Sequence, residues 1–289
     1  MPFPTLASKT LIWLLAATLA LTGCSRMNLA YRNLDLLIPW TLNDYLDMTG
    51  DQQKRFRAQL RDHLGWHCRT QLPGYLDTLA RLQGQVRDGQ LNEAALREHY
   101  AYATEAVAAI AKEITPTTAQ LLADLDDDQV RDLSESLEED RREREEKYLG
   151  PSDAEQIRER ADRMRERVER WTGTTDAEQR QRILQWAHAV APQTRLWLEN
   201  RAAWQQALRD ALDRRHEPGF DERVARLLQD REAYWTPAYR AAFPAAEKAA
   251  IDLFSDLYRL TDAKQRRHID KQLQDLRNDL GSLDCLPAN

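Results

Sequence analysis

Apolar residues recur every three to four positions along most of this chain, and this spacing constrains the fold more than any other feature. Phe56, Leu60 and Leu64 show it early, and Ile269 and Leu273 repeat it near the end. An α-helix has about 3.6 residues per turn, so this spacing gathers apolar side chains on one helical face. No stretch shows the period-two alternation of a half-buried strand. The sequence therefore predicts an all-α protein, a multi-helix bundle of antiparallel helix hairpins.

The composition favours long helices with solvated faces. Charged residues make up 30% of the chain, and only 10 Gly and 11 Pro punctuate its 289 residues. Gly and Pro are the residues that most disfavour helix interiors, so their scarcity leaves room for long helices. We expect residues 34–289 to form one all-helical domain.

A charged segment lies in the middle of the chain. Residues 138–147 are almost wholly charged with mixed signs, and the helix expected after Gly150 has one narrow apolar stripe through Met164 and Val168. Such helices expose most of their surface, so the sequence predicts a protruding charged arm over residues 134–171. A run of this kind is usually a solvated helix face, and the alternative is a docking site for a charged partner.

Three predicted helix starts share one spelling: SDAEQ at residues 152–156, TDAEQ at 175–179 and TDAKQ at 261–265. A Ser or Thr N-cap with Glu three positions later forms a capping box, which fits the first two starts, whereas Lys264 weakens the third. Convergent capping explains the likeness, and a degenerate repeat of helix pairs is the alternative.

The first residues of the chain carry a targeting signal. Lys9 precedes an apolar segment, residues 11–21, that is too short to span a bilayer. The segment runs into a tetrapeptide that resembles the cleavage site of bacterial lipoprotein precursors: Leu21, Thr22, Gly23 and Cys24. The resemblance implies that residues 1–23 are a signal peptide. It also implies that the Cys24 thiol receives diacylglycerol and that its new amino group receives an N-acyl chain.

Ser25 follows the acylated cysteine. Resemblance to enterobacterial lipoprotein sorting implies that Asp at this position would favour the inner membrane and that Ser does not. We therefore expect residues 24–33 to form a lipidated tether at the outer membrane, with the body facing the periplasm. Two or more acyl chains anchor a protein stably without a basic patch.

The net charge narrows the classes of partner. Removing residues 1–23 takes away one Lys and no acid, so the formal charge changes from −6 to −7. Nucleic-acid binders and proteins held electrostatically on anionic membranes carry a basic face or tail. We expect attachment to the membrane through the lipid anchor, a protein partner in the envelope, and no nucleic acid.

Two cysteines are left once Cys24 is acylated. Cys68 and Cys285 belong to an exported chain in an oxidising compartment, and they form the one possible pair. We predict a disulfide between them. The alternative is a buried free thiol at Cys68 and an exposed one at Cys285.

Motifs for catalysis and metal binding are scarce. His63 and His67 lie four residues apart on one helical face and are weak candidates for metal ligands. A metal site needs further ligands, and a structural or surface His pair is the commoner case. The sequence has no nucleophile elbow, phosphate-binding glycine loop or dinucleotide fingerprint. We therefore predict no resident metal or cofactor and no enzymatic activity.

Aromatic residues concentrate in the second half of the chain. Trp186, Trp197, Trp204 and Trp235 either line a groove for a peptide or glycan or, as is commoner at helical spacing, belong to the core.

Two resemblances bear on function. Residues 48–52 (MTGDQ) are similar to the Leu-Thr-x-x-Gln signature of Spy-like periplasmic chaperones, which are all-helical cradles, with Met48 in place of Leu. The lipobox followed by residues 31–35, 45–47, 66–67 and 71–73 resembles a family of proteobacterial lipoproteins of unknown function. That second resemblance implies a location and no reaction.

These observations favour a non-catalytic envelope scaffold or protein-interaction module that binds its partner through the charged arm. The alternative is a chaperone-like binder of unfolded proteins. A hydrolase with dispersed catalytic residues is the third possibility.

Overall fold

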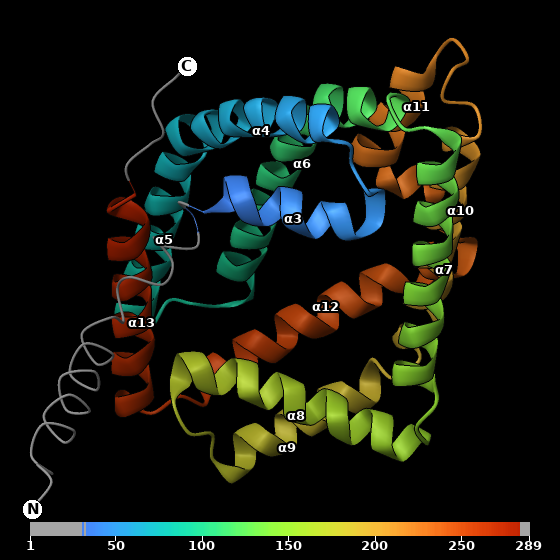
Figure 1. Ribbon diagram of the computed structural model, residues 1–289. Helices are drawn as coiled ribbons and strands as arrows, with labels where there is room; N and C mark the ends of the chain where they lie inside the picture. Colours follow the sequence, from blue (N-terminus) through green and yellow to red (C-terminus); the bar gives the residue numbers. More distant parts are fainter. Residues whose placement is uncertain (1–30, 32, 284–289) are drawn as a thin grey trace, which may run out of the picture.

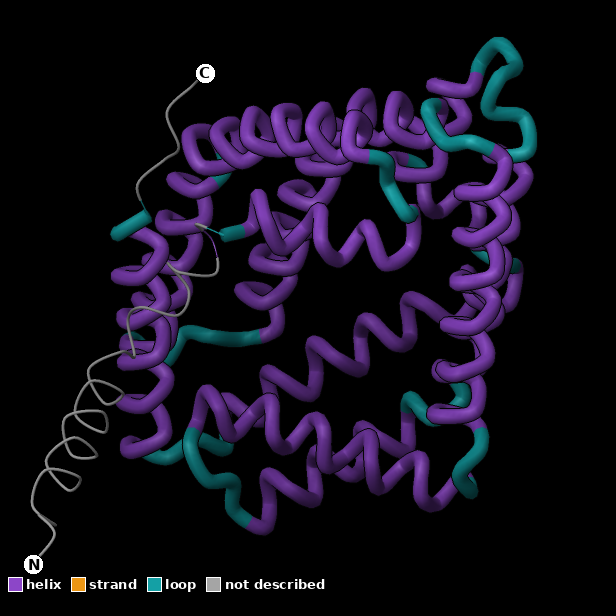
Figure 2. Tube along the Cα trace, in the orientation of Figure 1, coloured by secondary structure: helices purple, strands orange, loops and turns teal. Residues whose placement is uncertain are grey.

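The computed structural model describes Tyr31 and residues 33–283, which fold into eleven α-helices and one short 3-10 helix and contain no strand (Figure 2). The all-α class is therefore confirmed. The helices are α3 (Leu34–Leu46), α4 (Gly50–Thr70), α5 (Leu72–Arg87), α6 (Glu93–Ala123), α7 (Asp127–Leu149), α8 (Asp153–Thr172), α9 (Ala177–Ala189), α10 (Gln193–Leu212), α11 (Phe220–Gln229), η1 (Arg231–Tyr234), α12 (Pro237–Arg259) and α13 (Ala263–Gly281).

The helices are arranged as a four-sided frame (Figure 1). In the view of Figure 1, α4 runs along the top, α7 and α10 form the right side, α8 and α9 the bottom, and α5 and α13 the left side, and the label of α11 stands at the upper right. α11 packs on α6, and α12 crosses the frame to contact α6, α9 and α10. α3 contacts α4 and α7.

Two hydrophobic clusters account for most of the core. The larger one joins α4 to α6, α7, α10 and α11, and it contains the predicted stripe of Phe56, Leu60 and Leu64. The smaller one joins α8, α9 and α12 through Met164, Ile183 and related apolar side chains. Burial of these stripes is the main force that holds the helices together, because the hydrophobic effect grows with the apolar area removed from water.

Residues 134–171, which we predicted to form a protruding arm, instead make up most of α7 and α8 and form two sides of the frame. α7 buries Leu133 and Leu137 and packs on α10, while α8 buries Met164 and Val168 and packs on α9 and α13. The segment does not protrude, because the stripe of α7 packs on α10 and the stripe of α8 packs on the following helix α9 and on α13.

At two of the three predicted helix starts, the N-cap residue is not the one that we predicted. Ser152 caps α8 as expected, but Asp176 and Asp262, not the preceding threonines, cap α9 and α13. Each threonine hydroxyl is used elsewhere: Thr175 donates to Glu169 over 2.7 Å and Thr261 donates to the Tyr258 carbonyl over 2.6 Å. The third helical position is therefore Gln179 in α9 and Gln265 in α13, and both starts are complete capping boxes.

Four capping-box glutamines pair across the frame in two reciprocal contacts, which we call the glutamine clasps. In the first clasp, Nε2 of Gln52 lies 3.1 Å from Oε1 of Gln129, and Nε2 of Gln129 lies 2.9 Å from Oε1 of Gln52. Gln179 and Gln265 repeat the arrangement with two distances of 2.9 Å. All four side chains are buried. Each clasp therefore joins the starts of two helices that are far apart in sequence.

Candidate functional site

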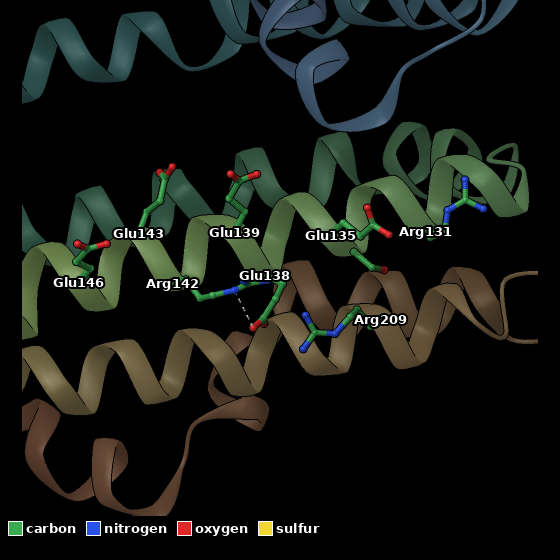
Figure 3. Close-up of a pocket in the computed structure, with 9 residues that line it drawn as sticks. Arg131, Glu135, Glu138, Glu139, Arg142, Glu143, Glu146 and Arg209 are labelled. Atoms are coloured by element: carbon green, nitrogen blue, oxygen red, sulfur yellow. Dashed lines mark ion pairs between the residues drawn. The ribbon is translucent and has the colours of Figure 1, made fainter.

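An open groove of about 820 Å³ runs along α7 and α10, and we call it the α7 groove (Figure 3). Its walls are almost wholly charged. The lining residues are Arg131, Ser134, Glu135, Glu138, Glu139, Arg142, Glu143, Glu146 and Arg209.

On one side of α7 the charges are neutralised within the chain. Asp140 accepts hydrogen bonds from Arg144 and from Arg201 of α10, both over 2.8 Å. The hydrogen bonds from Arg144 lower the pKa of the Asp140 carboxyl, and Arg201 adds to the effect. Arg141 is held between Glu138, at 2.6 Å, and Glu145, at 2.7 Å. The Asp140–Arg201 ion pair links α7 to α10, and Glu138, which also lines the groove, is neutralised by Arg141.

On the groove side, four glutamates have no such neutralisation. Glu135, Glu139, Glu143 and Glu146 are exposed, and their carboxylates form no hydrogen bond or ion pair within the part of the chain that the structure describes. Their spacing of four, four and three residues puts them on one helical face, and Figure 3 shows Glu139, Glu143 and Glu146 projecting to the same side. We call this set the glutamate stripe.

The glutamate stripe is unfavourable for the helix that carries it. Like charges four residues apart on a helix destabilise it by roughly 0.2–0.5 kcal/mol per pair. The charged run of residues 138–147 is evident in the sequence, but it does not contain Glu135, and sequence alone does not separate paired from unpaired acids. The signal that was available is the repeated four-residue spacing of Glu135, Glu139 and Glu143.

A second groove, which we call the aromatic groove, lies where α6, α10 and α12 meet. Its volume is about 430 Å³, and its walls are mostly apolar. Three of its aromatic side chains are exposed: Tyr100 at 42%, Trp197 at 37% and Phe254 at 44%. The lining residues are Leu96, Tyr100, Gln193, Trp197, Tyr239, Phe243, Ala246, Glu247, Ala250, Ile251 and Phe254.

The four tryptophans singled out from the sequence divide between core and groove. Trp204 packs against the larger core and donates its Nε1–H to the Leu227 carbonyl over 3.0 Å, and Trp186 packs against the smaller core. Trp197 lines the aromatic groove. Trp235 packs against two groove residues, edge-to-face on Tyr239 with ring centroids 5.2 Å apart and tilted against Phe243 at 4.7 Å.

The two candidate metal-ligand histidines have separate partners. Nδ1 of His63 lies 3.1 Å from Glu113, and its Nε2 lies 2.7 Å from the Thr117 hydroxyl. Nδ1 of His67 lies 3.1 Å from the Tyr31 hydroxyl, and burial lowers the pKa of His67. Among the described residues there is no group of three or more His, Cys, Asp or Glu that could hold a metal ion. His63 therefore joins α4 to α6, and His67 joins α4 to Tyr31.

The remaining predicted site residues lie largely outside the described part of the chain. Leu21, Thr22, Gly23, Cys24, Ser25 and Cys285 all belong to that group. Cys68 is buried in a small cluster with Leu72 and Leu283, and Leu283 is two residues before Cys285. The pairing of Cys68 with Cys285 stays a prediction. None of the described helices is long and apolar enough to cross a bilayer.

Comparison with known proteins gives one match. The model of a family of unknown function, DUF6279, matches residues 44–240. The matched region includes the first glutamine clasp and the whole α7 groove. No curated protein and no solved structure matches the chain.

Proposed function

The chain belongs to the DUF6279 family of unknown function, and from its own geometry we propose that it is a non-catalytic protein-interaction module with a docking site for a basic partner in the α7 groove. The observation that carries this proposal is the glutamate stripe. Four exposed carboxylates without a cationic partner face one groove, while the acids on the other side of the same helix are all paired with arginines.

Charge complementarity supports a partner rich in Lys or Arg. A cationic segment laid along α7 would remove the repulsion within the stripe and would form ion pairs that the chain itself does not supply. Such surfaces mainly set the rate of association and its specificity. We therefore expect association that weakens steeply as the salt concentration rises.

The proposal includes the place of action that we expect from the sequence. A lipid-anchored body, held through acylated Cys24 at the outer membrane and facing the periplasm, would meet partners in the envelope. We infer this location from the lipobox resemblance of residues 21–24 and from Ser25.

Charge reversal in the groove tests the docking site. Glu139→Lys with Glu143→Lys should abolish the main crosslinked adduct that the full-length protein forms in cell envelopes. The matched control reverses Glu105 and Glu166, which are exposed, lie on α6 and α8, and have no ion pair within the described residues. An adduct that survives the groove variant, or that both variants lose equally, would contradict the proposal.

The second candidate function is a chaperone-like binder of unfolded proteins, and the aromatic groove is the observation that favours it. Exposed apolar patches beside a groove are typical of sites that take apolar side chains. Trp197→Ser with Phe254→Ser should then reduce the suppression of client aggregation. Glu139→Lys with Glu143→Lys, in the α7 groove, should not reduce it. Many unrelated adducts in envelopes would favour this second function, and one dominant adduct would favour the first.

A further inference from the structure

Helix α3 presents an apolar face that nothing in the described chain covers. Of the nine large hydrophobic side chains that are exposed among the described residues, four lie on this one helix of 13 residues. They are Leu36 at 52%, Leu37 at 45% and Trp40 at 67%, which form the uncovered face, and Tyr45 at 37%, which lies near the end of the helix on its core-facing side.

The other face of α3 packs against the core. Leu34, Ile38 and Leu42 pack against the larger core, and Leu46 is part of it. The outward residues Leu36, Leu37 and Trp40 lie one, three and four positions apart, which puts them on the opposite side of the same two turns. α3 is therefore apolar on both sides, although it packs against the protein on only one.

In the sequence, the start of α3 is close to Cys24, the proposed lipid attachment point. The Tyr31 hydroxyl donates to the Leu64 carbonyl over 3.4 Å and lies 3.1 Å from Nδ1 of His67, so α4 fixes the chain just before α3. Cys24 is seven residues before Tyr31. Seven residues reach at most about 25 Å when fully extended, and α3 itself is about 20 Å long. Acyl chains on Cys24 would therefore hold α3 within reach of the bilayer surface.

We propose that the outward face of α3 docks onto the lipid bilayer that receives the acyl chains of Cys24, an inference that rests on the lipid anchoring in the proposed function. Trp and Tyr concentrate at membrane interfaces, and a helix that lies in the interface buries its apolar face by roughly 5–10 Å. Leu36, Leu37 and Trp40 are the inserting residues.

The charges on α3 indicate which lipid headgroups it binds and how deeply it inserts. The helix has no Lys or Arg, and its acids are Asp35 and Asp44. Without cations it gains nothing from anionic lipid headgroups, so apolar insertion, aided by the covalent lipid, must supply the binding. Asp44 is exposed at the far end of the outward face, and its carboxylate stays among the headgroups while the first two turns insert.

The experiment places an environment-sensitive fluorescent amino acid at position 40 of the full-length protein, purified with its lipid and reconstituted in vesicles of phosphatidylethanolamine and phosphatidylcholine. The matched control places it at position 107, where Val107 is 59% exposed on α6. We expect a blue shift and quenching by lipids brominated in their acyl chains at position 40, and neither at position 107. Circular dichroism of both proteins checks that the label leaves the fold intact.

The other outcomes separate the possible failures. A lipidated protein whose position 40 stays water-exposed would overturn the docking of α3 and leave the anchor standing. A blue shift without lipid quenching, dependent on protein concentration, would mean that a second copy covers the face and would also overturn it. Mass spectrometry that finds Cys24 without lipid would refute the anchor, and the inference would fail with it.

Discussion

Gln52 is the side chain through which the first glutamine clasp is most readily tested. It is 5% exposed. Its Nε2 donates to the Asp124 carbonyl over 2.7 Å, and its Oε1 accepts from the Thr49 amide over 2.8 Å. Two further hydrogen bonds join it to Gln129. Gln52→Leu keeps a similar volume and removes all four bonds.

The expected cost follows from that count. Each hydrogen bond contributes about 1 kcal/mol net to stability, and the exposed Thr49 and Asp124 backbone groups can turn to water instead. We therefore expect Gln52→Leu to lower the free energy of unfolding by about 2–3 kcal/mol. Gln129→Leu should cost a similar amount, because Gln129 also donates to the Leu46 and Asp47 carbonyls, over 3.0 and 2.9 Å.

A double-mutant cycle isolates the contact between the two glutamines. The two bonds between them are lost in either single variant, so the double variant should cost about 1–2 kcal/mol less than the sum of the singles. Urea unfolding of residues 25–289, followed by far-ultraviolet circular dichroism, measures all three. Gln52→Leu combined with Gln179→Leu is the control, because the two residues belong to different clasps and should add to within about 0.5 kcal/mol. Additive costs for Gln52 and Gln129 would refute the clasp as an energetic unit.

Three further predictions concern stability and covalent structure. Gly84→Ala should raise stability by about 0.5–1 kcal/mol in thermal unfolding, since Gly84 is inside α5 and no atom lies within 4 Å of an added Cβ; a loss would show a hidden clash. Burial lowers the pKa of His67, so below about pH 6.5 the unfolded chain binds more protons at this residue than the folded chain. The free energy of unfolding therefore has its full value above about pH 6.5 and decreases as the pH falls through the pKa of the folded state. His67→Phe should reduce the dependence of the unfolding free energy on pH, measured by urea unfolding at a series of pH values. The remaining dependence is expected from His99, whose pKa burial also lowers. An unchanged pH dependence would argue against a role for His67. Mass spectrometry of the non-reduced protein should find Cys68 linked to Cys285, and two alkylatable thiols after denaturation would exclude the bridge.

The sequence predicts the helices well because their stripes are local. Phe56, Leu60 and Leu64 lie on one face whatever they pack against, so their burial follows from spacing alone. The capping residues of α9 and α13 were misplaced by one position because Thr-Asp offers two adjacent N-cap candidates. The choice depends on where the threonine hydroxyl finds its own partner, which is Glu169 for Thr175.

The candidate site was predictable only in part, because pairing between distant segments decides it. The clasp partners Gln52 and Gln129 are 77 residues apart, and no periodicity connects them. The charged run of α7 was evident, but which of its acids lack a partner depends on α10, where Arg201 neutralises Asp140. The same holds for the aromatic groove, since Trp197 lines it together with Tyr239 and Phe243 only because α10 packs against α12.

Site-specific photocrosslinking tests the docking site in the α7 groove most directly. A photoreactive amino acid at position 139, in the glutamate stripe, is compared in intact envelopes with the same amino acid at position 197, in the aromatic groove. We predict one dominant protein adduct from position 139, lost at high salt and unaffected by changes at position 197. No adduct at position 139, together with many unrelated adducts at position 197, would contradict the docking site and favour the chaperone-like function.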